Sequence, residues 1–418
     1  MSDCRPAMDG IGYDMLRDVS FHVVGVSHHT AGIELRERFA FTSAEIAAWL
    51  QGQAAAGSTA LLLSTCNRCE IYWTGDLDLE AWFRDFSVSR GACLGEALLR
   101  LDGEEAVRHL FDVAAGLDSQ ILGETEVLGQ VRRAYDAARA AGTTNRLIDS
   151  ILSASLVAGR RVRRETMLGR HPASVSSAAV DVAASVAGGL AGARALVLGA
   201  GEAAEGVLKA LHGRTAATAL VNRRAERAAA LACAWGAVPG AWDELDALLA
   251  ASDVVFVATS AGHPVISAAR LAEAVRPRGR ELSVFDLSVP RNVEPSAGSV
   301  PGIRLFDLDD LQRLRCPVEG FASPAIDHAR LVLDQELERL DTALRARAAA
   351  PRLAELHRMA SRLAEEEVDV ALARLGDLDD REQQVVREMA ERLVRRVLYP
   401  VSRTVREAGG NPEVAAGQ

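Results

Sequence analysis

The chain has 418 residues, a length that predicts two or three domains. Of these residues 49% are apolar and 25% are charged, a composition typical of a globular protein. It contains no apolar run of membrane-spanning length and no signal-peptide core near its start, so we expect a cytoplasmic protein without membrane contact. The net charge of −10 argues against nucleic-acid binding through bulk charge and restricts such contacts to local basic patches.

The first part of the chain predicts an α/β domain over residues 21–170, after an extension at 1–20. Residues 21–27 alternate and are rich in valine, which predicts a strand, and residues 59–66 predict a second one. Helices are predicted at 43–57, from 104 to a C-cap at Gly116, up to Gly142, and over 145–166.

Two cysteines, Cys66 and Cys69, stand three residues apart in "STCNRCEIYW". No second pair completes a zinc site, and the strand-like flanks count against a redox dithiol without excluding it. The polar neighbours of Cys66 indicate an exposed nucleophile, whereas Cys69 adjoins apolar residues and is expected to be packed. If the strand continues that far, Arg68 lies on the same side as Cys66, where a cation favours the thiolate. A further hypothesis is that oxidation joins the two cysteines.

Two other polar groups invite a functional interpretation. His28 and His29 suggest a metal, but adjacent strand positions point to opposite faces, so we expect no metal site. The stretch "GRRVRRET" holds four arginines within a predicted helix: Arg160, Arg161, Arg163 and Arg164. Three interpretations are open for these arginines: a solvated helix face, a nucleic-acid contact, or the lining of an interdomain cleft.

Residues 171–318 alternate strand and helix, which predicts a parallel, doubly wound nucleotide-binding domain. "VLGAGEAAEG" fits G-x-G-x-x-A between a strand and a helix, as a pyrophosphate site requires. The next strand ends in Asn222, Arg223 and Arg224 rather than an acid, which favours NADPH over NAD. The predicted cofactor-binding residues are Gly199, Ala200, Gly201, Glu202, Ala203, Ala204, Asn222, Arg223 and Arg224. A glycine turn that packs without a ligand is the alternative.

The last part predicts an all-helical dimerisation domain over 319–410 and a tail at 411–418. Heptad-like leucines occur at 333, 337, 340 and 344, and a second stripe joins Val385, Met389, Leu393 and Val397. We expect Pro351 to interrupt the first of these helices.

Five motifs in this order resemble the glutamyl-tRNA reductase family: "STCNRCEIY", "RHLFDVAAGLDSQILGETEVLGQV", "RRVRRET", "VLGAGEAAEG" and "DLSVPRNVEP". The resemblance covers nearly the whole chain and implies a catalytic α/β domain, a Rossmann-like NADPH domain and a helical dimerisation domain on a long spinal helix. It implies NADPH-dependent reduction of glutamyl-tRNA(Glu) to glutamate-1-semialdehyde, which begins tetrapyrrole synthesis. A homodimer and a partner aminomutase that receives the product are implied as well.

The resemblance also implies residue roles. Cys66 is the expected nucleophile, and His109 matches a histidine that the family needs for activity. The expected substrate-binding residues are Thr65, Asn67, Arg68, Ser119, Glu124, Thr125, Glu126 and Gln130. The chain departs from the family at Thr125 and Glu126, where proline and glutamine are usual, and at Cys69, where threonine or valine is common.

Two other functions are compatible with parts of the sequence. The first is a non-catalytic tRNA-binding paralogue, against which the presence of Cys66, Arg68 and His109 speaks. The second is an enzyme of the shikimate dehydrogenase type, which needs neither a catalytic thiol nor a helical tail.

Overall fold

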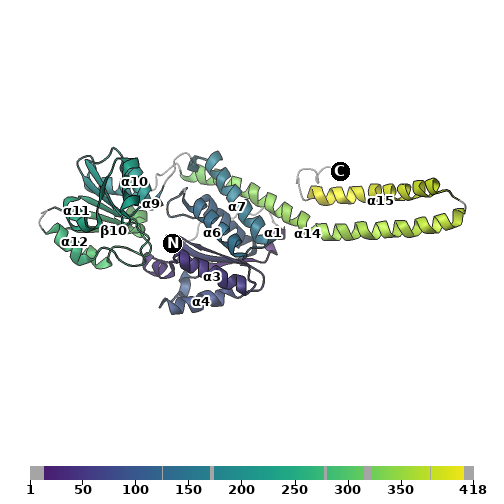
Figure 1. The fold of residues 1–418 in the computed structure, drawn as a ribbon, viewed down its shortest axis with the longest axis horizontal. Coiled ribbons are helices and arrows are strands. Elements are labelled where there is room, and N and C mark those ends of the chain that lie inside the picture. Colours follow the sequence, from purple (N-terminus) through teal and green to yellow (C-terminus); the bar gives the residue numbers. More distant parts are fainter. Residues whose placement is uncertain are drawn as a thin grey trace. The chain divides into compact units, whose positions relative to one another are not determined.

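The computed structural model describes residues 14–124, 126–169, 174–276, 280–314, 322–376 and 378–408 (Figure 1). Thr125 and the predicted tail lie outside these ranges. Contacts divide the chain into a helical unit, Met1–Val19 with Asp334–Gln418, and an α/β unit, Ser20–Leu333. The domain boundaries near residues 170 and 318 stay predictions.

The first sheet of the α/β unit has four antiparallel strands in the order β2-β3-β1-β4. They are β1 (Phe21–Ser27), β2 (Ala60–Ser64), β3 (Arg68–Thr74) and β4 (Leu99–Asp102). Two helices, α3 (Ser43–Ala55) and α4 (Leu79–Ser89), contribute to the apolar cluster on one face. The remaining helices of this part, α5 (Gly103–Ala115), α6 (Glu126–Ala141) and α7 (Arg146–Glu165), pack together beside the sheet. We call this part the four-stranded half.

Strand β3 separates two kinds of side chain, because successive strand residues point to opposite faces. Cys69, Ile71 and Trp73 are buried in the apolar cluster that includes Phe39 of the 3-10 turn Glu37–Phe39 and Phe83 of α4. Arg68, Glu70 and Tyr72 point the other way, where the Tyr72 ring stacks on the His109 ring of α5 at 6.4 Å. The prediction that Cys69 is packed is confirmed.

The second sheet, which with its helices we call the six-stranded half, is parallel with the order β10-β9-β8-β5-β6-β7. This confirms the doubly wound prediction. The strands are β5 (Arg194–Leu198), β6 (Ala217–Val221), β7 (Val238–Gly240), β8 (Val254–Val257), β9 (Leu282–Asp286) and β10 (Ile303–Phe306). Helices α8 (Val175–Ala187), α9 (Glu202–Leu211), α10 (Ala225–Trp235) and α13 (Leu308–Leu314) cover one face, and α11 (Leu245–Ala251) and α12 (Ala268–Val275) cover the other.

The helical unit consists of α1 (Asp14–Arg17), the distal part of α14 (Ala322–Leu375) and α15 (Asp380–Ala408). Helix α15 folds back along α14, where Arg387 pairs with Asp369 at 3.3 Å (Figure 1). Asp341 of α14 accepts hydrogen bonds from the Met15 and Leu16 amides at 3.0 and 3.1 Å. Among the described residues, no helix has the length and apolar content needed to cross a membrane.

The predicted leucine stripe of α14 is confirmed, since Leu333, Leu337, Leu340 and Leu344 are all buried. The predicted interruption at Pro351 is wrong, because α14 continues through it for 54 residues in total. Proline removes a single backbone donor, and the many remaining hydrogen bonds of a long helix keep it continuous.

Candidate active site

Cys66 lies in the tight turn between β2 and β3. The Thr65 amide donates to the Arg68 carbonyl at 2.8 Å, and Thr65 Oγ1 accepts from the Asn67 and Arg68 amides at 3.1 and 3.2 Å. The Thr65 side chain therefore fixes the turn that presents Cys66. Because Arg68 begins β3 and Cys66 precedes it in the turn, the expected strand-like alternation of these two residues is wrong.

Arg68 is instead held by two carboxylates on the α5 side of the sheet. Its Nη1 lies 2.8 Å from Glu70 Oε1 and 2.8 Å from Asp118 Oδ2, and its Nη2 donates to the Asp118 carbonyl. Burial alone would raise the pKa of the Glu70 carboxyl, but Arg68 and His109 lower that pKa to about 2. The charge of Arg68 is thus balanced by Glu70 and Asp118.

His109 belongs to the same network. Its Nε2 lies 3.0 Å from Glu70 Oε1, and its Nδ1 lies 3.7 Å from Asp118 Oδ2. Burial lowers the pKa of the imidazole, but Glu70 outweighs it and the net pKa is raised, which favours the imidazolium. Tyr72 completes the group by donating its hydroxyl to Glu70 Oε2 at 2.5 Å.

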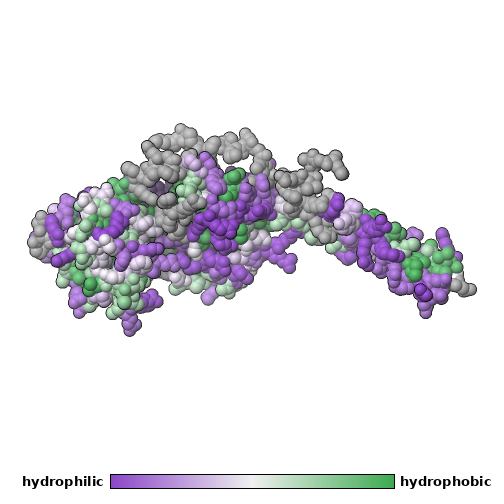
Figure 2. Space-filling model, turned by 90° about the horizontal axis from the view of Figure 1, so that it is seen from above, coloured by the Kyte–Doolittle hydropathy of each residue, from purple (hydrophilic) through white to green (hydrophobic). Residues whose placement is uncertain are grey.

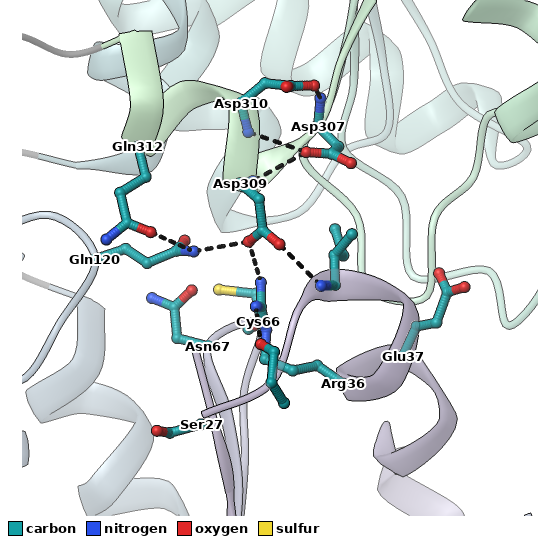
Figure 3. A network of polar contacts seen from close by, with 12 residues as sticks. Ser27, Arg36, Glu37, Cys66, Asn67, Gln120, Asp307, Asp309, Asp310 and Gln312 are labelled. Carbon is teal, nitrogen blue, oxygen red and sulfur yellow. Dashed lines mark hydrogen bonds and ion pairs between the residues drawn. The ribbon is translucent and has the colours of Figure 1, made fainter. Parts of the chain in front are cut away.

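The thiol of Cys66 faces a different set of groups (Figure 3). Its side chain is half-buried and packs against the apolar cluster of the six-stranded half, together with Ile33 and Ile121. Burial, followed by the carboxylates of Glu124 and Glu126, raises the pKa of the thiol to about 12, and the Arg36 guanidinium opposes this rise. The cation near the thiol is therefore Arg36, which the sequence did not indicate.

Glu124 belongs to a cluster of polar groups beside the Cys66 turn. Asn67 Nδ2 donates to Glu124 Oε2 at 3.5 Å, and Arg163 Nη2 donates to the Glu124 carbonyl at 3.2 Å. Burial, then Glu126, raises the pKa of the Glu124 carboxyl to about 7. Asn67 Oδ1 and Arg163 Nε are buried without a hydrogen-bond partner among the described residues. A buried acceptor and a buried donor are thus left for a ligand.

The remaining predicted substrate-binding residues belong to the segment around Glu124 and to α6. Ser119 bonds the Glu124 carboxyl, and Glu126 is the first residue of α6. Gln130 is half-buried one turn further along α6. Of the basic stretch, Arg163 points inward, whereas Arg161 and Arg164 pair with Glu165 at 2.8 and 2.7 Å.

Two interpretations of sequence motifs need correction. His28 and His29 follow the end of β1, and their rings lie 3.9 Å apart, so they do not point to opposite faces of a strand. The described residues contain no group of three ligands that fits a metal ion. Cys66 and Cys69 face different apolar clusters, which speaks against the hypothesis that oxidation joins them.

The glycine turn after β5 has the shape of a phosphate cradle. Gly199 has φ +116°, and a Cβ there would lie 2.0 Å from the Ala258 carbonyl oxygen. Gly201 caps α9 without a side-chain hydrogen bond, and nothing lies within 4 Å of the position that its Cβ would occupy. The first amides of α9, from Glu202 on, are therefore accessible to an anion, as a dinucleotide requires.

The other predicted cofactor residues surround this cradle. Ala203 accepts a hydrogen bond from Ser176 Oγ at 2.9 Å, and Ala204 is buried, so both pack α9 against α8 and the sheet. After β6, Asn222 Nδ2 donates to the Arg224 carbonyl at 3.1 Å. The Arg223 guanidinium lies 5.8 Å from the centre of the Trp242 ring, and Arg224 is exposed. These residues fit a nicotinamide dinucleotide.

Sequence reasoning missed Arg36, Glu70, Asp118 and Asp309. Glu70 had a detectable signal, since Arg68, Glu70 and Tyr72 alternate along β3 and must share one face. Arg36 and Asp309 are 273 positions apart and meet only in the folded chain, where they pair at 2.8 Å.

Comparison with known proteins adds to this geometry. Residues 24–166 match the sequence pattern described as "Glutamyl-tRNAGlu reductase, N-terminal domain", and residues 328–416 match the "dimerisation domain" of the same family. Residues 181–314 match the pattern "Shikimate / quinate 5-dehydrogenase". Glutamyl-tRNA reductase 2 of Anaeromyxobacter dehalogenans (strain 2CP-C) is 36% identical over 406 residues, covering 96% of this chain and 91% of that protein. The chain belongs to the glutamyl-tRNA reductase family.

A further relative agrees with this assignment to the glutamyl-tRNA reductases. The glutamyl-tRNA reductase of Deinococcus radiodurans is 44% identical over 297 residues, covering 70% of this chain and 84% of that one. A solved structure of the Methanopyrus kandleri enzyme is 30% identical, with 93% of this chain and 98% of that chain covered and a TM-score of 0.42. The family resemblance is confirmed, and the chain is an oxidoreductase; the dehydrogenase pattern is confined to the six-stranded half.

Proposed function

We propose that the chain reduces glutamyl-tRNA(Glu) to glutamate-1-semialdehyde with NADPH and releases the tRNA, the first committed step of tetrapyrrole synthesis. The observation that carries this proposal is the turn that presents Cys66 beside two buried polar atoms, Asn67 Oδ1 and Arg163 Nε, that have no hydrogen-bond partner in the described part of the chain. An aminoacyl group offers both an ammonium donor and carboxylate or carbonyl acceptors, so it matches a polar cluster in which one buried acceptor and one buried donor are open.

The chemistry assigned to Cys66 is acyl transfer. Its thiolate attacks the ester carbonyl carbon, the bond from that carbon to the tRNA ribose oxygen breaks, and the ribose oxygen takes a proton. When bound, NADPH would supply the hydride that turns the resulting thioester into the aldehyde. Thr65, Asn67, Arg68, Ser119, Glu124, Thr125, Glu126 and Gln130 are the proposed substrate contacts, and the Arg68–Glu70–His109 network would hold Arg68 and His109 in place.

Purified protein mixed with glutamyl-tRNA is expected to oxidise NADPH, and Cys66→Ser is expected to abolish this oxidation while still binding the tRNA. A serine hydroxyl is far less nucleophilic than a thiolate, so no acyl-enzyme forms. Cys93→Ser, at an exposed cysteine, is the matched control and should keep wild-type turnover. Tight tRNA binding without NADPH oxidation by the wild type would favour the non-catalytic paralogue instead.

We assign the cofactor preference to the residues after β6. Arg224 is exposed beside the proposed ribose site, where its guanidinium would pair with the additional phosphate of NADPH. Arg224→Ser is expected to raise the KM for NADPH about ten- to hundredfold, the usual value of a charge-assisted hydrogen bond, and to leave the KM for NADH nearly unchanged. Arg227→Ser, at an exposed arginine on α10, is the control. An equal change of both KM values would refute the assignment.

A homodimer through α14 and α15 is part of the proposal. These helices expose Leu356, Met359, Leu363, Val385, Met389, Leu393 and Val397, and Figure 2 shows hydrophobic patches on the helical end of the molecule. Such a face is typical of a helical interface. The cytoplasmic location and an aminomutase that takes up the product are proposed from the family alone.

A further inference from the structure

The six-stranded half covers the proposed nucleophile. Three residues of the four-stranded half, Ile33, Ile121 and Cys66, pack into the apolar cluster that one face of the six-stranded sheet forms with α8, α9, α10 and α13. Burial in this place raises the pKa of the Cys66 thiol to about 12, compared with an ordinary value of 9.0. At neutral pH, the ionised fraction of this thiol is about a thousandfold smaller than that of a solvated cysteine. It is therefore unsuited to attack an ester.

Arg36 connects the Cys66 turn to the six-stranded half. It ends α2 (Ile33–Arg36) and is only 3% exposed. Its Nε donates to the Cys66 carbonyl at 3.3 Å, its Nη1 to the Ala31 carbonyl at 2.7 Å, and its Nη2 to Asp309 Oδ1 at 2.8 Å. One guanidinium thus contacts the backbone of the nucleophile and a carboxylate of α13 (Figure 3).

Asp309 receives further donors from the four-stranded half. Its Oδ2 accepts the Ile33 amide at 2.8 Å, and its Oδ1 accepts Gln120 Nε2 at 3.1 Å. In Figure 3, Gln120 lies to the left of the Asp309 carboxylate and the Arg36 guanidinium lies below it, and all of these donors come from the half that carries Cys66. The side chain of Asp309 is 25% exposed, so this ion pair is only partly screened by water.

We propose that Arg36 is a positioning residue whose pairing with Asp309 holds the six-stranded half over Cys66, and that Arg36 activates the thiol once Asp309 has withdrawn. The proposal rests on the proposed function, in which Cys66 is the nucleophile. The charged groups that face the thiol are Glu124, Glu126 and Arg36, and only Arg36 favours the thiolate. While Asp309 balances the charge of Arg36, the carboxylates dominate. Withdrawal of α13 removes the balancing charge and the apolar cover at the same time.

The rate of Cys66 alkylation by iodoacetamide, resolved by peptide mass spectrometry across pH, tests this proposal. The thiolate displaces iodide, so the rate reports both access and ionisation. Asp309→Asn is expected to speed the reaction at least tenfold, because it uncovers the thiol and leaves Arg36 to favour the thiolate. Arg36→Gln also breaks the pair but removes the cation, so we expect a smaller rise and a higher pH midpoint than in Asp309→Asn.

Asp310→Asn is the matched control, because Asp310 lies on the same helix but pairs with Arg313 and the Asp307 amide. It should stay within about twofold of the wild type. Buried Cys69 is the internal marker of unfolding. If Asp309→Asn exposes Cys69 as well, Gln120→Leu takes the place of Asp309→Asn as the test variant. We then expect a severalfold rise in the alkylation rate of Cys66 and no rise for Cys69.

A Cys66 rate in the folded variant within twofold of the wild type, or equal pH midpoints in Asp309→Asn and Arg36→Gln, would overturn the proposal. The assay uses neither tRNA nor NADPH. Its failure is therefore distinguishable from a failure of the proposed reduction, which would appear as missing NADPH oxidation in the wild type.

Discussion

Replacing Arg68 with methionine is expected to lower the free energy of unfolding of the α/β unit by about 3–5 kcal/mol. Arg68 is 1% exposed and Glu70 is fully buried, and they pair at 2.8 Å. Methionine fills much of the same volume but leaves the Glu70 carboxylate buried with only His109 and Tyr72 to stabilise it. Chemical denaturation followed by tryptophan fluorescence would measure the loss.

The matched control is Arg84→Met, which breaks an exposed pair with Glu80 on α4 and should cost less than about 1 kcal/mol. The pH dependence gives a second readout. The pKa of Glu70 is lowered from 4.5 to about 2, so its contribution is complete above pH 4.5 and is lost as the pH falls towards 2. Wild-type stability should fall across this window, and the fall should be smaller in Arg68→Met. Equal losses of unfolding free energy in Arg68→Met and Arg84→Met would contradict the role of a buried pair.

Replacing Gly199 with alanine is expected to destabilise the six-stranded half by about 2–4 kcal/mol and to abolish dinucleotide binding. The added Cβ would lie 2.0 Å from the Ala258 carbonyl oxygen, and φ at this position is +116°. Both effects force the turn away from the end of β8. Thermal unfolding and a fluorescence titration with NADPH measure the two consequences.

Two other glycines separate the consequences of the Gly199 substitution. Gly201 has open space around its Cβ position, so Gly201→Ala should keep wild-type stability but weaken NADPH binding by occupying the phosphate approach. Gly192 is equally open but lies before β5, and Gly192→Ala should change neither property. Undiminished NADPH binding by Gly201→Ala would show that the pyrophosphate does not approach this turn.

The sequence predicts most of this fold because its long elements carry a strong periodicity. The helices α5 to α7 and the leucine stripe of α14 were visible in the spacing of apolar residues. The glycine turn was visible as a motif between a strand and a helix. Strands β4, β7 and β10 were missed because they have only four, three and four residues and, unlike the equally short β8, contain no unbroken apolar run. Pairing with a neighbouring strand defines such short segments, and pairing is a property of the folded chain.

The predicted site was less complete for a related reason. Cys66, Asn67 and Glu124 were found from their motifs, and the structure brings all three together. The electrostatic partner of each group was not predicted, since Arg68 turns to Glu70 and Asp118 while Arg36 faces the thiol. The side-chain direction follows from strand alternation only within a strand, and β3 begins at Arg68, two residues after Cys66, so the alternation does not relate these two side chains.

Strand β3 also determines which substitutions this region tolerates. Its odd positions, Cys69, Ile71 and Trp73, are buried in the apolar cluster on the α3 and α4 side. Volume-conserving changes such as Cys69→Val should therefore be nearly neutral there. Its even positions, Arg68, Glu70 and Tyr72, share one hydrogen-bonded charge system, so each change leaves a buried partner unsatisfied. Saturation mutagenesis of these six residues should alternate, residue by residue, between intolerant and permissive positions.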